Sequence, residues 1–108
     1  MATFNGTEGE PIDLAQAAAW TANYRNTEAE KSAETVIKAH FFGREILQEL
    51  LNQEGCVGIR MYYALDNEGQ KQLVLVGADA DGNDIEELVL DGSRICPPNC
   101  SEGGNLNG

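Results

Sequence analysis

The feature that most constrains the fold is a largely apolar run, residues 72–78, that two turn-forming segments bracket. Side chains of a strand point alternately to its two faces, so a strand that is apolar on both faces has to be covered on both sides. The flanking segments, residues 66–69 and 79–84, combine Asp, Asn and Gly, and Gly69 suits the left-handed position of a type I turn followed by a bulge. The run therefore predicts the central strand of a sheet.

The segments on either side of this run also have strand patterning. Apolar and other residues alternate from Val57 to Leu65, and residues 85–90 follow the second turn. Short turns join neighbouring antiparallel strands, so we expect a three-stranded meander. Such a sheet has two open edges, and self-association through the sheet is one way to cover them.

A helix is expected before the sheet, starting at Leu14. Asp13 and Gln16 have the spacing of a capping box, and an Ala-rich stretch continues the helix to about Tyr24. Residues 25–32 are polar and are expected to connect this helix to the next element.

A second, longer helix is expected over residues 33–53. On a helical wheel its apolar side chains, with His40 among them, cover one wide arc, and Phe41 and Phe42 lie at the two borders. Gly43 lies on the same arc, where it either admits another backbone or marks a break between two shorter helices.

Together these elements predict an α+β fold in which two N-terminal helices pack on a three-stranded antiparallel meander. We expect residues 1–10 to be a flexible lead-in, residues 11–95 a single domain, and residues 96–108 a flexible tail with Cys and Pro. A chain of 108 residues buries about two-thirds of its unfolded surface, which suffices for one core.

The charge balance excludes several classes of partner. Eighteen acidic and seven basic side chains give a formal charge of −11, which disfavours nucleic acid and anionic membrane surfaces. The sequence contains no long apolar segment and no signal-peptide pattern at its start, so we expect a cytoplasmic protein. We interpret the acidity as a solvating rim around an apolar interior.

The cysteines leave three interpretations open. Cys96 and Cys100 flank a short loop that contains two prolines, and Cys56 stands alone. With His40 they make up a Cys3His set that suits zinc, although a second paired knuckle is missing. A local disulfide or a redox role is the second interpretation. An odd number of thiols in a chain without an export signal favours the third, reduced thiols.

His40, the single histidine, also has more than one interpretation. A neutral imidazole is a common metal ligand and a common general base near pH 7. A histidine on an apolar helix face is, however, more often a core residue whose ring nitrogens are satisfied by neighbours.

Aromatic residues provide the candidates for a protein interface. Such residues are enriched in interface hot spots, although core packing is the alternative for most of them. The candidates are Trp20, Phe41, Phe42, Tyr62 and Tyr63.

Four segments resemble a group of small uncharacterised bacterial proteins of about this length. They are residues 40–47 (HFFGREIL), 55–66 (GCVGIRMYYALD), 72–84 (QLVLVGADADGND) and the C-P-P-x-C segment at 96–100. The resemblance extends from about Phe4 to Cys100, and it implies a bacterial cytoplasmic protein without assigning a catalytic role to any residue.

The sequence favours a non-enzymatic interaction or self-assembly module, because an apolar surplus occurs without an assembled active site. The expected partner is a protein, most simply a second copy of this chain, and neither nucleic acid nor membrane. One alternative is a small metal-binding protein that holds zinc with Cys96, Cys100 and either His40 or Cys56, and no other cofactor is expected. A second alternative is an enzyme with His40 as general base.

Overall fold

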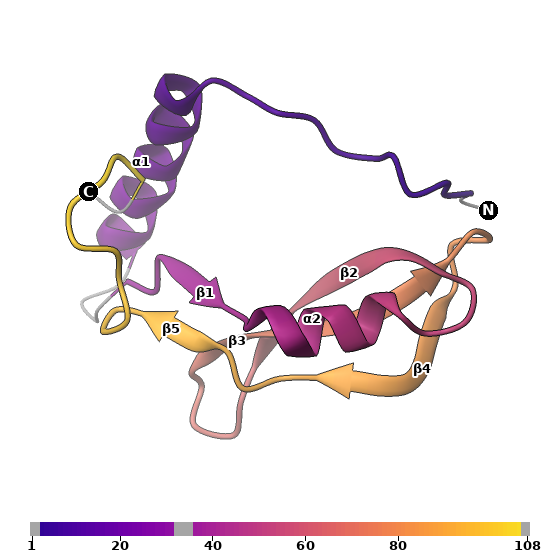
Figure 1. Cartoon of the computed structure of the whole chain (residues 1–108). Coiled ribbons are helices and arrows are strands. Elements are labelled where there is room, and N and C mark those ends of the chain that lie inside the picture. Colours follow the sequence, from indigo (N-terminus) through magenta and orange to yellow (C-terminus); the bar gives the residue numbers. More distant parts are fainter. Residues whose placement is uncertain (1–2, 32–35, 107–108) are drawn as a thin grey trace. The chain divides into compact units, whose positions relative to one another are not determined.

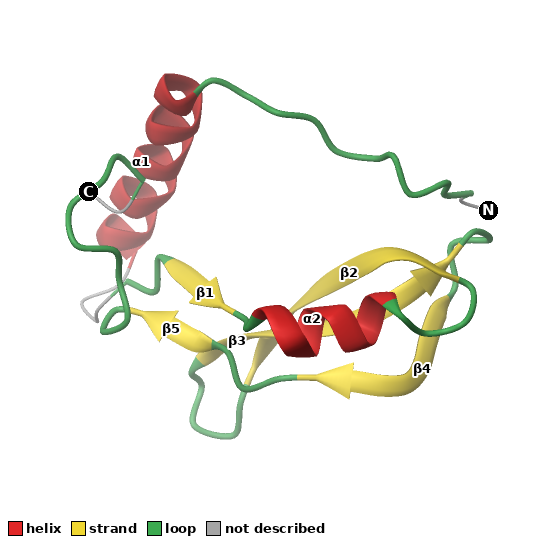
Figure 2. Ribbon diagram, in the orientation of Figure 1, coloured by secondary structure: helices red, strands yellow, loops and turns green. Residues whose placement is uncertain are grey.

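A computed structural model describes residues 3–31 and 36–106 of the chain. Within these residues the elements are α1 (Leu14–Lys31), β1 (Ala39–Phe41), α2 (Arg44–Leu51), β2 (Cys56–Leu65), β3 (Lys71–Asp79), β4 (Asp84–Leu90) and β5 (Arg94–Cys96) (Figures 1 and 2).

The chain forms two compact units. One, the sheet unit, comprises the described residues of Met1–Gly9 and Phe42–Ser93, and the other, the disulfide unit, those of Glu10–Phe41 and Arg94–Gly108. The sheet unit contains α2 and β2 to β4, whereas the disulfide unit contains α1, β1 and β5. The predicted boundaries of lead-in, domain and tail stay predictions.

The sheet unit contains the predicted meander. Its strands are antiparallel in the order β2-β3-β4, so β3 is the central strand. The register places Arg60 opposite Val76 on one face and Met61 opposite Leu75 on the other. Two helices and this sheet confirm the mixed α+β class.

One face of β3 is covered by α2. Leu50 of α2, Leu75 of β3 and Leu90 of β4 form the buried core of this face. Partly buried apolar side chains surround these three residues, namely Phe42, Ile46, Leu47, Ile59, Leu73 and Leu88.

Polar side chains bridge the other face of β3. Val76 and Ala78 are only 3% exposed there. Arg60 lies opposite Val76 and Asp84 opposite Ala78, and an ion pair of 2.6 Å joins Arg60 to Asp84 across the central strand. The requirement that this strand be covered on both sides is therefore met by a helix on one face and an ion pair on the other.

The two hairpin turns have the same design. Gly69 and Gly82 have φ angles of +81° and +84°, the left-handed conformation that glycine adopts without strain. In each turn the Oδ1 atom of the first Asp, Asp66 or Asp79, accepts backbone hydrogen bonds from the residues two and four positions later. The donors are the N–H groups of Glu68 and Gln70 at 2.9 Å each, and those of Asp81 and Asn83 at 3.0 and 2.9 Å.

The predicted second helix, residues 33–53, is wrong in extent. Residues 32–35 lie outside the described residues, β1 occupies Ala39–Phe41, and the helix itself is only Arg44–Leu51. Gly43 is the N-cap of α2 and is extended, with φ −70° and ψ 154°, so it marks a break. The wide apolar arc is thus divided between a strand and a short helix, each with its own partner.

The first helix is longer than predicted. It starts at Leu14 as expected, and the carbonyl of Asp13 accepts a hydrogen bond from the Ala17 N–H at 3.0 Å. The polar residues that follow Tyr24 continue the helix to Lys31 instead of forming a connection. They include good helix formers and no Gly or Pro, so nothing local ends the helix there.

A two-stranded ribbon was not predicted. Strands β1 and β5 pair antiparallel, with Ala39 opposite Cys96 and Phe41 opposite Arg94. Each strand has three residues, which is too short to display a period in the sequence.

The turn carboxylates generate a first prediction. Asp66→Ala and Asp79→Ala should each lower the urea concentration at the midpoint of unfolding, because each removes the acceptor of two turn N–H groups. The two turns flank β3 at opposite ends, so the double variant should lower it by about the sum. Urea denaturation measures these changes.

Asp91→Ala is the matched control. Asp91 is an exposed residue just after β4 and lies outside both hairpin turns. This variant should change the free energy of unfolding by less than about 0.5 kcal/mol. Equal effects of all three substitutions would contradict the role assigned to the turns.

A second prediction concerns Gly77 in the middle of β3. A Cβ atom there would lie 2.8 Å from Gln53 Nε2 and 3.0 Å from Cys56 Sγ. The flexible end of Gln53 would have to move away from the Leu50 carbonyl, to which it donates at 3.0 Å, so Gly77→Ala should destabilise by about 1 kcal/mol. A Cβ atom on Gly58 of β2 would meet nothing within 4 Å. Thermal denaturation should therefore show Gly58→Ala close to the wild type and Gly77→Ala clearly below it.

Candidate functional site

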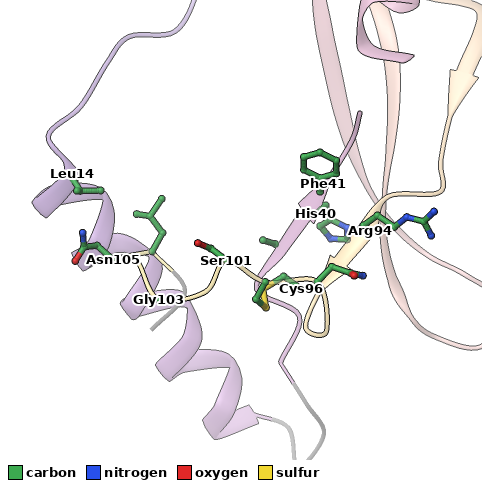
Figure 3. Close-up of a pocket in the computed structure, with 13 residues that line it drawn as sticks. Leu14, His40, Phe41, Arg94, Cys96, Ser101, Gly103 and Asn105 are labelled. Carbon is green, nitrogen blue, oxygen red and sulfur yellow. A yellow bond between two sulfur atoms is a disulfide. The ribbon is translucent and has the colours of Figure 1, made fainter. Parts of the chain in front are cut away.

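The candidate site is a hollow of about 380 Å³ in the disulfide unit. Figure 3 shows the residues that surround it, which come from the start of α1, from β1, from β5 and from the segment after β5. The lining consists of Leu14, Ala39, His40, Phe41, Arg94, Cys96, Asn99, Cys100, Ser101, Gly103, Gly104, Asn105 and Leu106.

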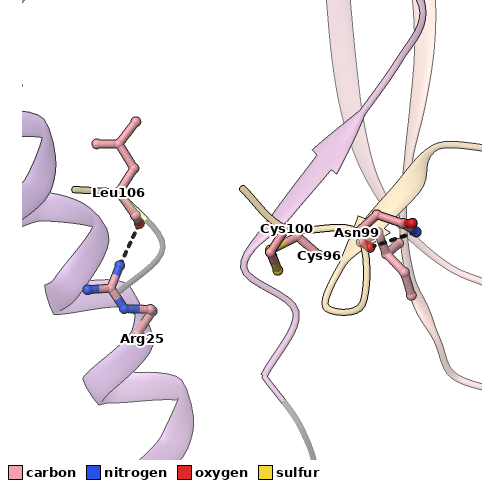
Figure 4. Close-up of a disulfide and its surroundings, with 6 residues drawn as sticks. Arg25, Cys96, Asn99, Cys100 and Leu106 are labelled. Carbon is pink, nitrogen blue, oxygen red and sulfur yellow. Dashed lines mark hydrogen bonds between the residues drawn. A yellow bond between two sulfur atoms is a disulfide. The ribbon is translucent and has the colours of Figure 1, made fainter. Parts of the chain in front are cut away.

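A disulfide between Cys96 and Cys100 forms part of this lining (Figure 4). The expectation of reduced thiols is therefore wrong for this pair in the structure. The loop that it closes is also held by hydrogen bonds to the Ile95 carbonyl, from the Asn99 N–H at 2.9 Å and from Asn99 Nδ2 at 3.3 Å. A bridge between residues only four apart removes little conformational entropy from the unfolded chain. Its contribution to the free energy of unfolding is about 2 kcal/mol, the lower end of the usual range for disulfides.

The segment after the disulfide is attached to α1. Arg25 Nη1 donates a hydrogen bond of 2.6 Å to the carbonyl of Leu106 (Figure 4). Leu106 and Leu14 of α1 both line the hollow. The helix and the C-terminal segment thus form one wall of the candidate site.

His40 lies on β1 and not on a helix face, which corrects the sequence prediction. It is opposite Ile95 of β5 and lines the hollow. Partial burial lowers the pKa of His40 below its ordinary value of 6.5. The imidazole is therefore neutral at pH 7, as the general-base alternative requires.

The predicted metal ligands are only partly brought together. His40, Cys96 and Cys100 line the same hollow, whereas Cys56 belongs to the sheet unit and its Sγ donates to the Gly58 carbonyl at 3.2 Å. A metal binds thiolates, and the disulfide holds two of the three sulfurs in another bond. Among residues 3–31 and 36–106, no group of three or more His, Cys, Asp or Glu is placed to hold a metal ion. This arrangement lends the zinc alternative no support.

The sequence does not predict a polar cluster that the structure shows in the sheet unit. Arg60 Nη1 donates to Asp84 Oδ1 at 2.6 Å and to the Gly82 carbonyl at 3.1 Å, and the Tyr62 hydroxyl donates to Asp84 Oδ2. The Arg60 guanidinium also lies 5.4 Å from the centroid of the Phe4 ring. No sequence signal links Arg60 and Asp84, because only the strand register brings them together.

The cluster shifts the pKa values of its members in the directions expected for a paired carboxylate. The hydrogen bond from Tyr62, followed by the interactions with Arg60, lowers the pKa of Asp84. The same carboxylate raises the pKa values of Tyr62 and Arg60. The carboxylate is thus committed to its neighbours, and the cluster acts as a structural bridge.

A hollow of about 320 Å³ lies beside this cluster. Residues from the N-terminal segment, from β2 and from β3 line it: Phe4, Gly6, Glu8, Val57, Gly58, Ile59, Arg60 and Ala78. The N-terminal segment is anchored there by a 2.8 Å hydrogen bond from the Phe4 N–H to the Ala80 carbonyl.

The five interface candidates lie in different environments. Trp20 on α1 and Phe41 on β1 are exposed. Phe42 packs against the core instead, and the Tyr62 hydroxyl is bonded to Asp84. Tyr63 is 95% exposed.

Tyr63 belongs to an exposed apolar row on β2. Met61 and Leu65 lie at alternate positions, on the same face of the strand, and are 58% and 69% exposed. The register places this row on the α2 side of the sheet. The alternation was visible in the sequence, but the shortness of α2, which leaves the row uncovered, was not.

Three comparisons found no match to this chain: with models of known protein families, with curated protein sequences and with solved structures. The resemblance to small bacterial proteins therefore stays a prediction. Within the part of the chain that the structure describes, no helix is long and apolar enough to span a membrane.

The Asp84 cluster generates a third prediction. Because its pKa is lowered on folding, ionised Asp84 stabilises the fold above the ordinary carboxyl pKa of 3.8, and this contribution is lost as the pH falls through the lowered value. Asp84→Asn should therefore be less stable than the wild type at pH 7, and the difference should shrink below pH 4. Urea denaturation at pH 7 and pH 3 measures it.

Asp91→Asn provides the control for this experiment. It removes one carboxylate from the same region of the chain without touching the cluster. A stability difference between Asp84→Asn and the wild type that stays constant from pH 7 to pH 3 would contradict the role of the Asp84 charge.

Proposed function

We propose that the protein is a non-enzymatic interaction module that self-associates through the edge strand β2. The observation that carries the proposal is the exposed row of Met61, Tyr63 and Leu65 on a strand that pairs on one side only within the described sheet. A row of large apolar side chains beside an open backbone edge is a common site of strand pairing between chains.

The distribution of charge favours β2 over β4 as the associating edge. β4 carries Glu86 and Glu87 in addition to Asp84, which is paired with Arg60, and acidic side chains on an edge strand hinder pairing. β2 carries one charged residue, Arg60, and Asp84 of the same chain neutralises it. A second copy with the same net charge of −11 meets the least repulsion at this uncharged edge.

A second copy also satisfies the geometry of the edge. Two β2 strands that pair antiparallel about a twofold axis present the same surface to each other, which is the requirement for a closed dimer. The two three-stranded sheets would then be continuous, and the apolar rows of both copies would lie next to each other on one face. A dimer of this kind pairs the part of the β2 edge that carries the apolar row.

The location belongs to the same proposal. We propose that this module works in the bacterial cytoplasm, because the chain resembles small bacterial proteins.

The fourth prediction tests the β2 edge. The wild type should sediment as a dimer at micromolar concentration, and Met61→Lys and Tyr63→Lys should each raise the dissociation constant at least about tenfold, because each places two like charges in the interface. Added salt should strengthen the wild-type dimer, since it screens the repulsion between two acidic chains. Analytical ultracentrifugation measures both effects.

Val89→Lys is the matched control. Val89 is also an exposed apolar residue, but it lies on β4 at the other edge of the sheet. This variant should dimerise like the wild type. A wild type that stays monomeric at high salt, or a Val89→Lys variant as impaired as Met61→Lys, would refute association through β2.

A further inference from the structure

We propose that the Cys96–Cys100 pair is a thiol–disulfide exchange site that reacts with small-molecule thiols, and that Cys100 is the sulfur they attack. The hollow of about 380 Å³ beside the bridge is the entrance to this site. The inference concerns the disulfide unit and does not rest on the proposed self-association.

Access determines which sulfur reacts. Both cysteines line the hollow, but Cys96 is 4% exposed, whereas Cys100 is half-buried. Exchange requires the incoming thiolate to approach one sulfur along the S–S bond, so accessibility sets the rate. Cys100 is the more exposed of the two residues, which favours attack on its sulfur with Cys96 as the leaving sulfur.

The reaction balances with a thiol as the only co-reactant. A small thiol loses its proton and attacks Cys100 Sγ, a mixed disulfide forms, and the electron pair of the broken S–S bond leaves on Cys96 Sγ, which takes up a proton. A second thiol then attacks the mixed disulfide and releases Cys100 as a thiol. Overall, two thiols are oxidised to one small disulfide, and the protein disulfide is reduced to a dithiol.

The loop keeps the two sulfurs close together after reduction. Asn99 holds the Ile95 carbonyl through its N–H and its side chain, and the Cys100 N–H donates to the Pro98 carbonyl at 3.0 Å. Pro97 and Pro98 restrict the backbone further, because the proline ring fixes φ. Since none of these restraints uses the S–S bond, the reduced pair is a vicinal dithiol that is ready to form the disulfide again.

The bridge is also poorly placed to act mainly as a structural staple. It joins residues four apart at the end of β5 and crosslinks no second element of the fold. Opening it leaves the pairing of β1 with β5 and the core around Leu50 chemically unchanged. A disulfide whose opening costs the fold little is suited to reversible exchange.

The size of the hollow favours a small molecule over a protein thiol. Its volume lies at the lower end of the range of small-ligand pockets. The bridge lies within a concave lining, which admits a slender thiol more readily than a cysteine on a folded surface. Reduced glutathione is the probe that we choose for this class.

The fifth prediction uses the full oxidised chain with Cys56→Ser, so that the pair is the only source of thiols. Reduced glutathione should open the bridge in the native protein at a rate within about a hundredfold of the rate in denaturant, because the sulfur is accessible without unfolding. Acid quenching, alkylation and peptide mapping should find the trapped glutathione on Cys100 and the alkyl group on Cys96.

The vicinal dithiol has its own test. Phenylarsine oxide, which bridges closely spaced thiols, should bind the reduced Cys56→Ser protein with one equivalent. It should bind neither the variant that also carries Cys100→Ser nor the one that also carries Cys96→Ser. Both of these keep a single thiol and serve as matched controls.

Three results would overturn the inference. They are native exchange more than a hundredfold slower than in denaturant, trapped glutathione on Cys96, and a reduced pair that fails to bind the arsenical. The exchange rate is measured from the oxidised folded protein, so the first two results are decisive even if a reduced variant were to unfold.

Discussion

The sheet unit depends on the burial of β3 on both of its faces. This strand is apolar at most positions and central in the sheet, so each face needs a cover. A helix of eight residues, α2, provides one cover through Leu50. The opposite cover comes from Arg60 and Asp84, whose ion pair crosses the strand above Val76 and Ala78. Here an ion pair covers the face that a second helix covers in many sheets, because the aliphatic part of the Arg60 side chain can shield apolar groups.

The two covers of β3 explain why the two edges of the sheet differ in charge and in exposed apolar side chains. The ion pair neutralises Arg60, so β2 is left without an uncompensated charge. Because α2 is short, the apolar row at Met61, Tyr63 and Leu65 stays exposed. The opposite edge, β4, carries the acidic residues Glu86 and Glu87. The proposed association of β2 edges thus follows from the same two covers that bury β3.

The disulfide unit is organised on a different principle. Its ribbon has three residues in each strand, and hydrogen bonds hold the segment that follows it. Asn99 donates locally to the Ile95 carbonyl, and Arg25 donates over a long sequence separation to the Leu106 carbonyl. These restraints shape a hollow around a chemically reactive group. A disulfide embedded in short-range structure can change its redox state without a change in the long-range pairing around it, which is the physical basis for the proposed exchange site.

Prediction from sequence succeeded where a local signal is strong. The meander, its central strand and the glycine turns at Gly69 and Gly82 were all predicted, because alternation and turn chemistry are written in neighbouring residues. The prediction of the second helix was wrong because residues 33–53 have helical periodicity, although part of the segment forms the strand β1. His40 was assigned to the wrong element for the same reason, although it still lines the candidate site.

The sequence by itself determined the α+β class, the meander and its turns, and a formal net charge of −11. Only the tertiary structure decided that Arg60 meets Asp84, that β1 meets β5, and that His40, Cys96 and Cys100 share one hollow. The reason is physical. Strand periods and turn preferences act over a few residues, whereas these three arrangements join groups far apart in the chain, which only strand register and packing bring together.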